Sequence, residues 1–428
     1  MAQPMDISSF ENLLKGRPES GLLRMIREVD EDELPSVRLS IFDLRCGTIE
    51  QDMATVERII SGNNKGINPQ ELKLYQGSIG AMVGMALADS MGHRFEFKPF
   101  CYEGDPQNLL TDMGTGPGGQ FHLQPGQWTD DTSMGLCLAD SLLMNKEWDP
   151  HDLMNRFLAW WSLGYNNAFR YDQKSRHSCG LGGNISLALE EYIVDPSNPY
   201  TVAGDSKTSG NGSVMRNAPI PICFYNDLNL ACEMAKNQSR VTHQGIEAAD
   251  CCKLLTFITI RLLHSQPTDN LHDILENIGK EFCDFVKDDC IDSVKYLACS
   301  QQEQLPDGSG LDKNRNWNWK VPKYIYSPDR LKKNSGYIGS YAMDAMAMAL
   351  HVLYTTKSFP EAIIKVVNMR GDSDSVGSVV GQMAGAFYGV QSIPKDWIKV
   401  LNQWDHGEVA LRGYMLARLI SHESYILE

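Results

Sequence analysis

Several short signatures of well-known protein classes are missing from this sequence. It contains no CxxC pair and no cluster of histidine and cysteine at zinc-ligand spacing, which argues against a zinc site. Its glycine loops at residues 114–120 and 179–184 fit neither a GxGxxG turn after a strand nor a GxxxxGK[ST] loop, so neither of these nucleotide-binding units is expected. Each loop by itself is more typical of an ordinary turn.

Positive charge is also scarce. The 39 Lys and Arg residues are outnumbered by 54 Asp and Glu residues, which gives a formal net charge of -15. No basic stripe follows the chain, and a nucleic-acid partner is therefore not expected. The first residues, MAQPMDISSFENLLKG, lack the basic and apolar regions of a signal peptide.

Long apolar runs and paired-cysteine patterns are absent too. The longest uncharged run, residues 375–394, is interrupted by Gly, Ser and Gln, and we interpret it as a buried helix rather than a membrane span. The eleven cysteines, an odd number, are interpreted as reduced thiols in the core. These features favour a soluble protein in the cytoplasm or another intracellular compartment. Because 42% of the residues are hydrophobic, the chain can bury a core of its own, and we expect a monomer.

The apolar residues that are present recur mainly at helical spacing, so we expect an all-α fold. Residues 1–70 are interpreted as an N-terminal helical appendage that ends in the linker SGNNKGINPQ, and residues 71–428 as the main domain. Residues 300–336 are rich in Gly, Pro, Asn, charge and aromatic side chains, and we interpret them as a candidate lid. Helices are predicted in the main domain near residues 71–90, 130–145, 150–163, 180–193, 228–239, 244–264, 270–299, 340–355, 359–368 and 375–389.

Two of the predicted helices carry small residues at every fourth position. This spacing makes a groove that lets a neighbouring helix approach closely, although each glycine costs roughly 1 kcal/mol in helix propensity relative to alanine. Such packing would bring together the carboxylates at the helix ends, Asp89 and Glu96 after the first helix and Asp372 and Asp374 before the second. The small residues are Gly80, Gly84 and Ala88 in the first helix and Gly377, Gly381, Gly385 and Gly389 in the second.

Two predicted helices begin with paired carboxylates, Asp130 and Asp131 in one and Asp372 and Asp374 in the other. Helix capping is one interpretation, because Asp and Ser favour the positive end of a helix dipole. One carboxylate would suffice for that, and two at the mouth of a buried helix repel each other unless a cation neutralises them. Oxygen ligands of this kind suit hard ions, so we predict a magnesium or manganese site.

Two further motifs are weaker. The stretch SKTSGNGSVMRNAPI, residues 206–220, is a loop of small residues that leads into a helix and exposes backbone N–H groups suited to a diphosphate. His243 in VTHQG is compatible with a ligand contact and equally with a satisfied histidine at a helix start.

Taken in order, these motifs carry a family resemblance. The sequence contains GSIGAMVGMALADSMGHRFEF, PGQWTDDTSMGL, GNGSVMR, VTHQG, SGYIGSYAMDAMAMAL and RGDSDSVGSVVGQMAGAFYG. This set resembles the ADP-ribosylglycohydrolase family, which includes the ADP-ribosylarginine and ADP-ribosylserine hydrolases and the dinitrogenase-reductase-activating glycohydrolase. The resemblance implies a compact, orthogonal multi-helix, all-α domain with a binuclear metal cleft that holds two Mg2+ or Mn2+ ions and binds ADP-ribose. The first 70 residues lie outside it.

The resemblance also implies roles for individual residues. Glu96 and Asp131 would be catalytic, with Glu96 near the scissile bond. The implied metal ligands are Thr129, Asp130, Asp131, Asp372, Asp374 and Ser375. The implied ADP-ribose contacts are Lys207, Thr208, Ser209, Gly210, Asn211, Gly212, Met215 and His243. The sequence departs from the usual family pattern where Ala88 precedes Asp89 and where Val376 follows Ser375.

The implied reaction is hydrolysis of the glycosidic bond between ADP-ribose and a modified protein side chain. The motifs DSDS and SGYIGS favour arginine as the acceptor over serine or other conjugates. A catalytically silent, crystallin-like or ADP-ribose-binding relative is the alternative. The stretch starting at Asp372 also fits the DxDx[TV] pattern of haloacid-dehalogenase phosphatases, but fewer than sixty residues follow it, which is too few for the α/β domain that those enzymes need.

Overall fold

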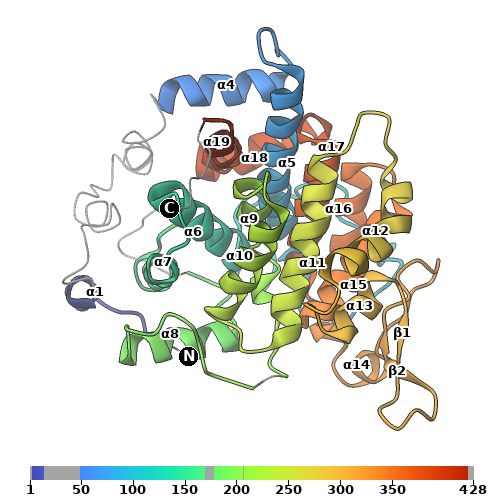
Figure 1. The fold of residues 1–428 in the computed structure, drawn as a ribbon. Coiled ribbons are helices and arrows are strands. Elements are labelled where there is room, and N and C mark those ends of the chain that lie inside the picture. Colours follow the sequence, from blue (N-terminus) through green and yellow to red (C-terminus); the bar gives the residue numbers. More distant parts are fainter. Residues whose placement is uncertain (1, 14–48, 169–177, 206, 423–428) are drawn as a thin grey trace.

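The computed structural model describes residues 2–13, 49–168, 178–205 and 207–422, and almost all of its regular structure is helical (Figure 1). The N-terminal part contains α1 (Ile7–Leu13) and α4 (Ile49–Ser61). The short 3-10 helices are η1 (Asn211–Ser213), η2 (Ser335–Tyr337) and η3 (Val390–Ser392). The remaining helices are α5 (Pro69–Gly92), α6 (Asp130–Asn145), α7 (Pro150–Leu163), α8 (Gly183–Val194), α9 (Pro219–Cys223), α10 (Leu228–Arg240), α11 (Ile246–Leu263), α12 (Leu271–Val286), α13 (Asp292–Ala298), α14 (Pro328–Lys333), α15 (Ala342–Thr355), α16 (Phe359–Asn368), α17 (Ser373–Tyr388), α18 (Lys395–Asp405) and α19 (Glu408–His422).

The all-α prediction is therefore confirmed, and most predicted helices lie within a few residues of the observed ones. One prediction was wrong: residues 270–299 form two helices, α12 and α13, because the chain turns at Lys287, where φ is 49°. Two helices near the C-terminus, α18 and α19, were not predicted. Within the described residues, none of the helices combines the length and the apolar character needed to cross a membrane.

Helices α5 and α17 pack against each other at the centre of the fold, as their glycines predicted (Figure 1). A Cβ atom built on Gly80 would lie 2.3 Å from the carbonyl oxygen of Gly385, and one built on Gly381 would lie 2.1 Å from that of Gly84. The pairing is antiparallel, since higher numbers on one helix meet lower numbers on the other. It therefore sets the end of α5 beside the start of α17.

The N-terminal part contacts the main domain through α4 and also through the residues before α1. Ala2 N–H donates to Ser186 Oγ at 2.6 Å, and Met5 N–H donates to Ser162 Oγ at 2.9 Å. Helix α4 packs against α5 and α19, and Asp52 on α4 forms an ion pair with Arg418 on α19. The linker after α4 is short, because α5 begins at Pro69 with Asn68 as its N-cap. The proposed division of the chain at residue 70 stays a prediction.

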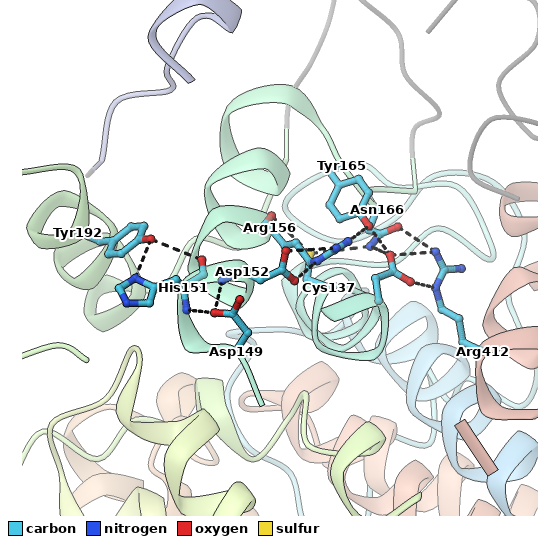
Figure 2. Close-up of polar contacts among 10 residues, drawn as sticks. Cys137, Asp149, His151, Asp152, Arg156, Tyr165, Asn166, Tyr192 and Arg412 are labelled. Carbon is cyan, nitrogen blue, oxygen red and sulfur yellow. Dashed lines mark hydrogen bonds and ion pairs between the residues drawn. The ribbon is translucent and has the colours of Figure 1, made fainter. Parts of the chain in front are cut away.

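A buried network of charges joins α6, α7 and α19, and Figure 2 shows it. Asp140 accepts hydrogen bonds from Arg412 Nε at 2.6 Å and from Asn166 Nδ2 at 2.9 Å, and also from the hydroxyl of Tyr165. Arg156 donates to that hydroxyl at 2.8 Å. Burial alone would raise the pKa of Asp140, but the charge and hydrogen bond of Arg412, together with the charge of Arg156 and the hydrogen bond from Asn166, outweigh it and hold the pKa below the usual value. This network explains the lone charge in the middle of α6 without any metal or ligand.

The predicted lid, residues 300–336, contains a two-stranded antiparallel hairpin, β1 (Gln302–Gln304) and β2 (Leu311–Asn316), followed by α14. Its base is anchored in the core, because Trp317 and Trp319 are fully buried and Trp319 Nε1 donates to the carbonyl of Leu297 at 2.7 Å. The aromatic residues of this segment are therefore core residues. Movement of the hairpin as a lid stays a prediction.

Candidate active site

The paired carboxylates at the starts of α6 and α17 do not act as helix caps. The N-cap residues are Thr129 and Asp372, and neither side chain accepts a capping hydrogen bond from its own helix. Asp130 and Asp131 lie in the first turn of α6 and Asp374 in the first turn of α17, and all three side chains are buried. Asp374 Oδ1 accepts a hydrogen bond within its own first turn, from the backbone N–H of the next residue at 3.0 Å, but capping does not account for the buried pair Asp130 and Asp131.

Asp89, near the end of α5, joins the two helix starts. Its carboxylate accepts hydrogen bonds from the backbone N–H and the hydroxyl of Thr129, and from the same two groups of Thr132, at 2.6–3.1 Å. The Thr129 hydroxyl also donates to Asp131 at 3.2 Å. Thr129 therefore faces Asp89 and Asp131, while Asp89 itself was not among the predicted site residues.

Two groups of three carboxylates are close enough to share a cation. One oxygen each of Asp89, Asp131 and Asp374 lie within 4.8 Å of one another, and so do oxygens of Glu96, Asp372 and Asp374. Asp374 belongs to both groups. The buried Oδ1 of Asp131 has no hydrogen-bond partner. This donor set, all oxygen with an unpartnered buried atom, fits a hard divalent cation.

The electrostatics of the cluster support this fit. Burial first, and neighbouring carboxylates second, raise the pKa values of Asp130, Asp131 and Asp374 well above the usual value. Among the described residues, no Lys or Arg forms an ion pair with any of these three. The carboxylates must therefore bind either protons or external cations.

Glu96 lies at the edge of the cluster. Burial, followed by the charges of Asp372 and Asp130, raises the pKa of Glu96 to about 9. Its Oε2 accepts a hydrogen bond from Gln120 Nε2 at 3.0 Å. Gln120 belongs to the glycine loop at residues 114–120, which sequence analysis interpreted as an ordinary turn. Gly119 in that loop has φ of +69°, and a Cβ there would lie 2.3 Å from the carbonyl oxygen of His93.

These carboxylates line a cavity of about 470 Å³. It brings together many of the predicted site residues, namely Glu96, Asp130, Asp131, Asp372, Asp374, Ser375, Gly210, Asn211, Gly212, Met215 and His243. It also contains residues that sequence analysis did not assign to the site, namely Phe97, Gly180, Leu181, Gly182, Gly183, Asn184, Ile185, Tyr337 and Ser340.

The loop before α8 is the largest part of the cavity wall that the sequence did not predict. Gly180 has φ of +88°, and a Cβ there would lie 2.0 Å from Oδ1 of Asp130. Only glycine lets the backbone approach the carboxylate so closely. The motif CGLGGN was visible in the sequence, and its glycines are the signal that could have placed this loop at the site.

The loop at residues 210–212 lies between the carboxylates and His243. Asn211 Nδ2 donates to Oδ2 of Asp372 at 3.1 Å, and a Cβ on Gly212 would lie 2.9 Å from Cε1 of His243. His243 Nδ1 is 2.8 Å from the hydroxyl of Thr242. Burial, followed by the charge of Arg216, lowers the pKa of His243 to about 3, so the ring is neutral.

Three predicted contacts lie outside this cavity. Lys207, Thr208 and Ser209 line a second cavity of about 930 Å³, together with β1, β2 and α14 of the predicted lid. The two cavities share Asn184, Gly210, Tyr337 and Ser340, so they are neighbours. A long ligand could contact both sides of the loop, whereas a small one in the carboxylate cavity would not reach Lys207.

Comparison with known proteins gives a consistent result. The family model described as ADP-ribosylglycohydrolase matches residues 71–424. The chain is 29% identical over 322 residues to the ADP-ribosylarginine hydrolase Tri1 of Pseudomonas putida (strain GB-1), which covers 75% of this chain and 72% of that protein. It is 25% identical over 332 residues to the ADP-ribosyl-[dinitrogen reductase] glycohydrolase of Rhodospirillum rubrum, covering 77% and 91%.

A solved structure described as an ADP-ribosylglycohydrolase-related protein complex superposes with a TM-score of 0.59 at 28% identity, covering 81% of this chain and 99% of that one. The matched region contains α5, α6 and α17, the helices whose ends carry the carboxylate cluster. On these grounds the chain belongs to the ADP-ribosylglycohydrolase family and is an enzyme of that family.

Proposed function

We propose that the protein removes ADP-ribose from modified protein side chains, with arginine as the favoured acceptor, and that the reaction depends on divalent cations. The observation that carries the proposal is the buried cluster of Asp89, Asp130, Asp131, Asp372 and Asp374 beside a cavity with a glycine loop. The similarity to ADP-ribosylarginine hydrolases supports the choice of arginine.

The residues that would hold the cations are the carboxylates and hydroxyls at the helix ends. Two Mg2+ or Mn2+ ions are proposed because Asp374 belongs to two carboxylate groups. When bound, such ions supply positive charge that orients the ribose hydroxyls and makes a bound water more acidic. The proposed ligands are Thr129, Asp130, Asp131, Asp372, Asp374 and Ser375, with Asp89 added from the structure.

The protein's own groups have separate tasks in this proposal. Glu96 lies at the edge of the cluster beside the cavity, where its carboxyl group would handle the proton of the acceptor nitrogen as the bond at the anomeric carbon breaks. The unpartnered Oδ1 of Asp131 can accept a proton from the attacking water. The products are ADP-ribose and the unmodified side chain.

The loop at residues 210–212 would bind the diphosphate. Gly210 and Gly212 have no side chain to shield their N–H groups, and η1 begins at Asn211. Neutral His243 packs against the loop and presents Nε2 toward Gly210, where a Cβ would lie 3.4 Å from it. Met215 also lines this cavity. Lys207, Thr208 and Ser209 would contact only the part of ADP-ribose that extends into the second cavity.

The test is a direct comparison of two substrates. Peptides carrying ADP-ribose on arginine or on serine are incubated with the protein in Mg2+, and the released ADP-ribose is measured. We expect faster release from arginine. Faster release from serine would overturn the assignment of arginine as acceptor but would leave the assignment as a hydrolase intact. Binding of ADP-ribose without release from either peptide would identify a catalytically silent relative.

We also infer an intracellular monomer with residues 1–70 as an appendage to the catalytic domain. All cysteines among the described residues are free thiols, which suits a reducing compartment. The buried main core supports folding as a single chain. Size-exclusion chromatography with light scattering tests the monomer, since a mass near 47.9 kDa is expected.

A further inference from the structure

Two cysteines far from the carboxylate cluster face each other. Cys283 lies in the last turns of α12, and Cys299 directly follows α13. Their sulfur atoms are 3.6 Å apart, although the residues are 16 positions apart in the sequence. Both are partly exposed, whereas Cys290, in the turn between the two helices, is buried. Neither cysteine has a role in the proposed reaction.

The backbone, rather than a chance rotamer, brings the two sulfurs together. A Cβ atom on Gly279 would lie 2.3 Å from the carbonyl oxygen of Ala298 and 2.7 Å from Cα of Cys299. The end of α13 therefore packs directly onto α12 at Gly279. Cys283 lies four residues later on the same face of α12, so it faces Cys299. A disulfide has a sulfur–sulfur bond of about 2.05 Å, which small side-chain rotations can reach from the observed separation.

We propose that Cys283 and Cys299 form a reversible intramolecular disulfide when the protein meets a small-molecule disulfide such as oxidised glutathione. In the first step the thiolate of Cys299 attacks one sulfur of the oxidant and releases one small thiol. In the second step the thiolate of Cys283 attacks the Cys299 sulfur and releases the second small thiol. The two cysteines lose two protons and two electrons in total, and the small disulfide gains them as it becomes two thiols.

The order of attack follows from the surroundings of Cys283. Burial, followed by the neighbouring Cys299, raises the pKa of the Cys283 thiol to about 12, so little of it is thiolate at neutral pH. Once a mixed disulfide has formed at Cys299, the short distance gives Cys283 a high effective concentration. Cys283 therefore acts as the resolving cysteine.

The bond would fasten the base of the β1–β2 hairpin to α12. Ser300, the next residue after Cys299, accepts a hydrogen bond at Oγ from the backbone N–H of Lys320 at 3.0 Å. The carbonyl of Gln301 accepts one from the N–H of Trp317 at 3.2 Å. The hairpin that starts here lines the second cavity. A cross-link across a loop of this length restricts the unfolded chain, and we expect the Tm to rise by roughly 5 °C.

The experiment uses the full chain, and its readout does not depend on catalytic activity. The protein is incubated with oxidised glutathione, and its intact mass and its disulfide-linked peptides are measured by mass spectrometry. We expect a loss of two hydrogens that dithiothreitol reverses, a linked peptide pair that contains Cys283 and Cys299, and a higher Tm. Absence of the mass loss, or a link that joins another pair of cysteines, would overturn the proposal. The wild-type protein is sufficient for this test.

Variants provide matched controls. Cys290→Ser makes the same chemical change between the two helices and should keep the mass loss and the rise in Tm. Cys283→Ser and Cys299→Ser should abolish both, and Cys299→Ser should also suppress the glutathione adduct at this site. If either of these two variants still lost two hydrogens, the assigned pair would be wrong. Because each variant is compared with its own reduced form, a general loss of stability does not affect the outcome.

Discussion

The carbonyl oxygen of Gly381 lies 2.3 Å from the position that a Cβ atom of Gly84 would occupy. This approach, repeated along α5 and α17, leaves no room for a side chain and places Asp89 near Asp374. The geometry of the carboxylate cluster is thus set by the packing of two helices, several turns away from the site.

Replacement of Gly84 by alanine should disturb both stability and the site. The new methyl group would meet backbone atoms of Gly381, which do not rotate away, and overpacking of this kind costs about 1–3 kcal/mol. We expect Gly84→Ala to lower the free energy of unfolding by that amount and to weaken Mg2+ binding. Urea titration and calorimetry measure the two effects. Gly310→Ala is the control, since nothing lies within 4 Å of a Cβ there; equal effects in both variants would contradict the packing argument.

Removal of the buried charge of Asp140 should destabilise the protein without affecting the carboxylate cluster. Asp140→Asn leaves Arg412 buried with an incomplete partner, and breaking a buried ion pair typically costs 3–5 kcal/mol. Asp288→Asn makes the same substitution at an exposed position and should change the free energy of unfolding by less than about 0.5 kcal/mol. Similar urea midpoints for the two variants would show that the network contributes nothing.

The same network predicts a dependence on pH. The pKa of Asp140 is lower in the folded protein than its usual value of 3.8. The folded state therefore binds a proton less readily than the unfolded state, and the stabilisation is complete above the usual pKa and is lost as pH falls through the lowered value. The stability difference between wild type and Asp140→Asn should shrink below pH 3.8. A difference that stays constant down to strongly acidic pH would contradict this assignment.

Neutralising one carboxylate of the cluster should have opposite effects with and without metal. The pKa of Asp374 is raised in the metal-free protein, so ionisation opposes folding as pH rises above the usual value of 3.8. Asp374→Asn should therefore raise the Tm of the metal-free protein at pH 7 and abolish the stabilisation by Mg2+. Thermal unfolding in chelator and in Mg2+ measures both. Full Mg2+ stabilisation of the variant would remove Asp374 from the cation site.

The glycine loop should affect the diphosphate more than the cations. In Gly212→Ala the new Cβ would lie 2.9 Å from Cε1 of His243, which displaces the ring or the loop. We expect the affinity for ADP-ribose to fall at least tenfold while ribose and Mg2+ bind as before, by calorimetric titration. Gly182→Ala, in the same cavity wall, is the control because its Cβ would be 3.6 Å from Ile185. A parallel loss of all three ligands would instead indicate an ordinary structural turn.

Much of this architecture was predictable because the periodicity of a helix is visible within a short stretch of sequence. The small residues at 80, 84, 377, 381 and 385 predicted which helices pair, and their close approach is confirmed. Gly389 was grouped with them but terminates α17 with φ of 73°. The same packing predicted that Asp89 lies near Asp374, although Asp89 was not named as a ligand. The contribution of Gly180 was harder to foresee, since it depends on a contact across the fold with Asp130. The break between α12 and α13 depends on a single positive φ at Lys287, for which the sequence gives no strong signal.

The second cavity shows a further limit of sequence reasoning. Lys207, Thr208 and Ser209 adjoin Gly210 in the sequence, and one motif therefore suggested one binding surface. The backbone of the loop turns between them, with Asn211 N–H donating to the carbonyl of Ser340 at 3.0 Å. Lys207, Thr208 and Ser209 line the second cavity, Asn211 and Gly212 line the first, and Gly210 lines both. Only three-dimensional packing decides this division.

The most direct test of the central claim is the rate at which ADP-ribose is released from an ADP-ribosylarginine peptide by wild type and Glu96→Gln, in Mg2+ and after chelation. The account predicts release by the wild type only with Mg2+, and turnover lowered ~100-fold or more in Glu96→Gln, with ADP-ribose affinity retained. Wild-type release that continues undiminished after chelation, or near wild-type turnover by Glu96→Gln, would contradict it.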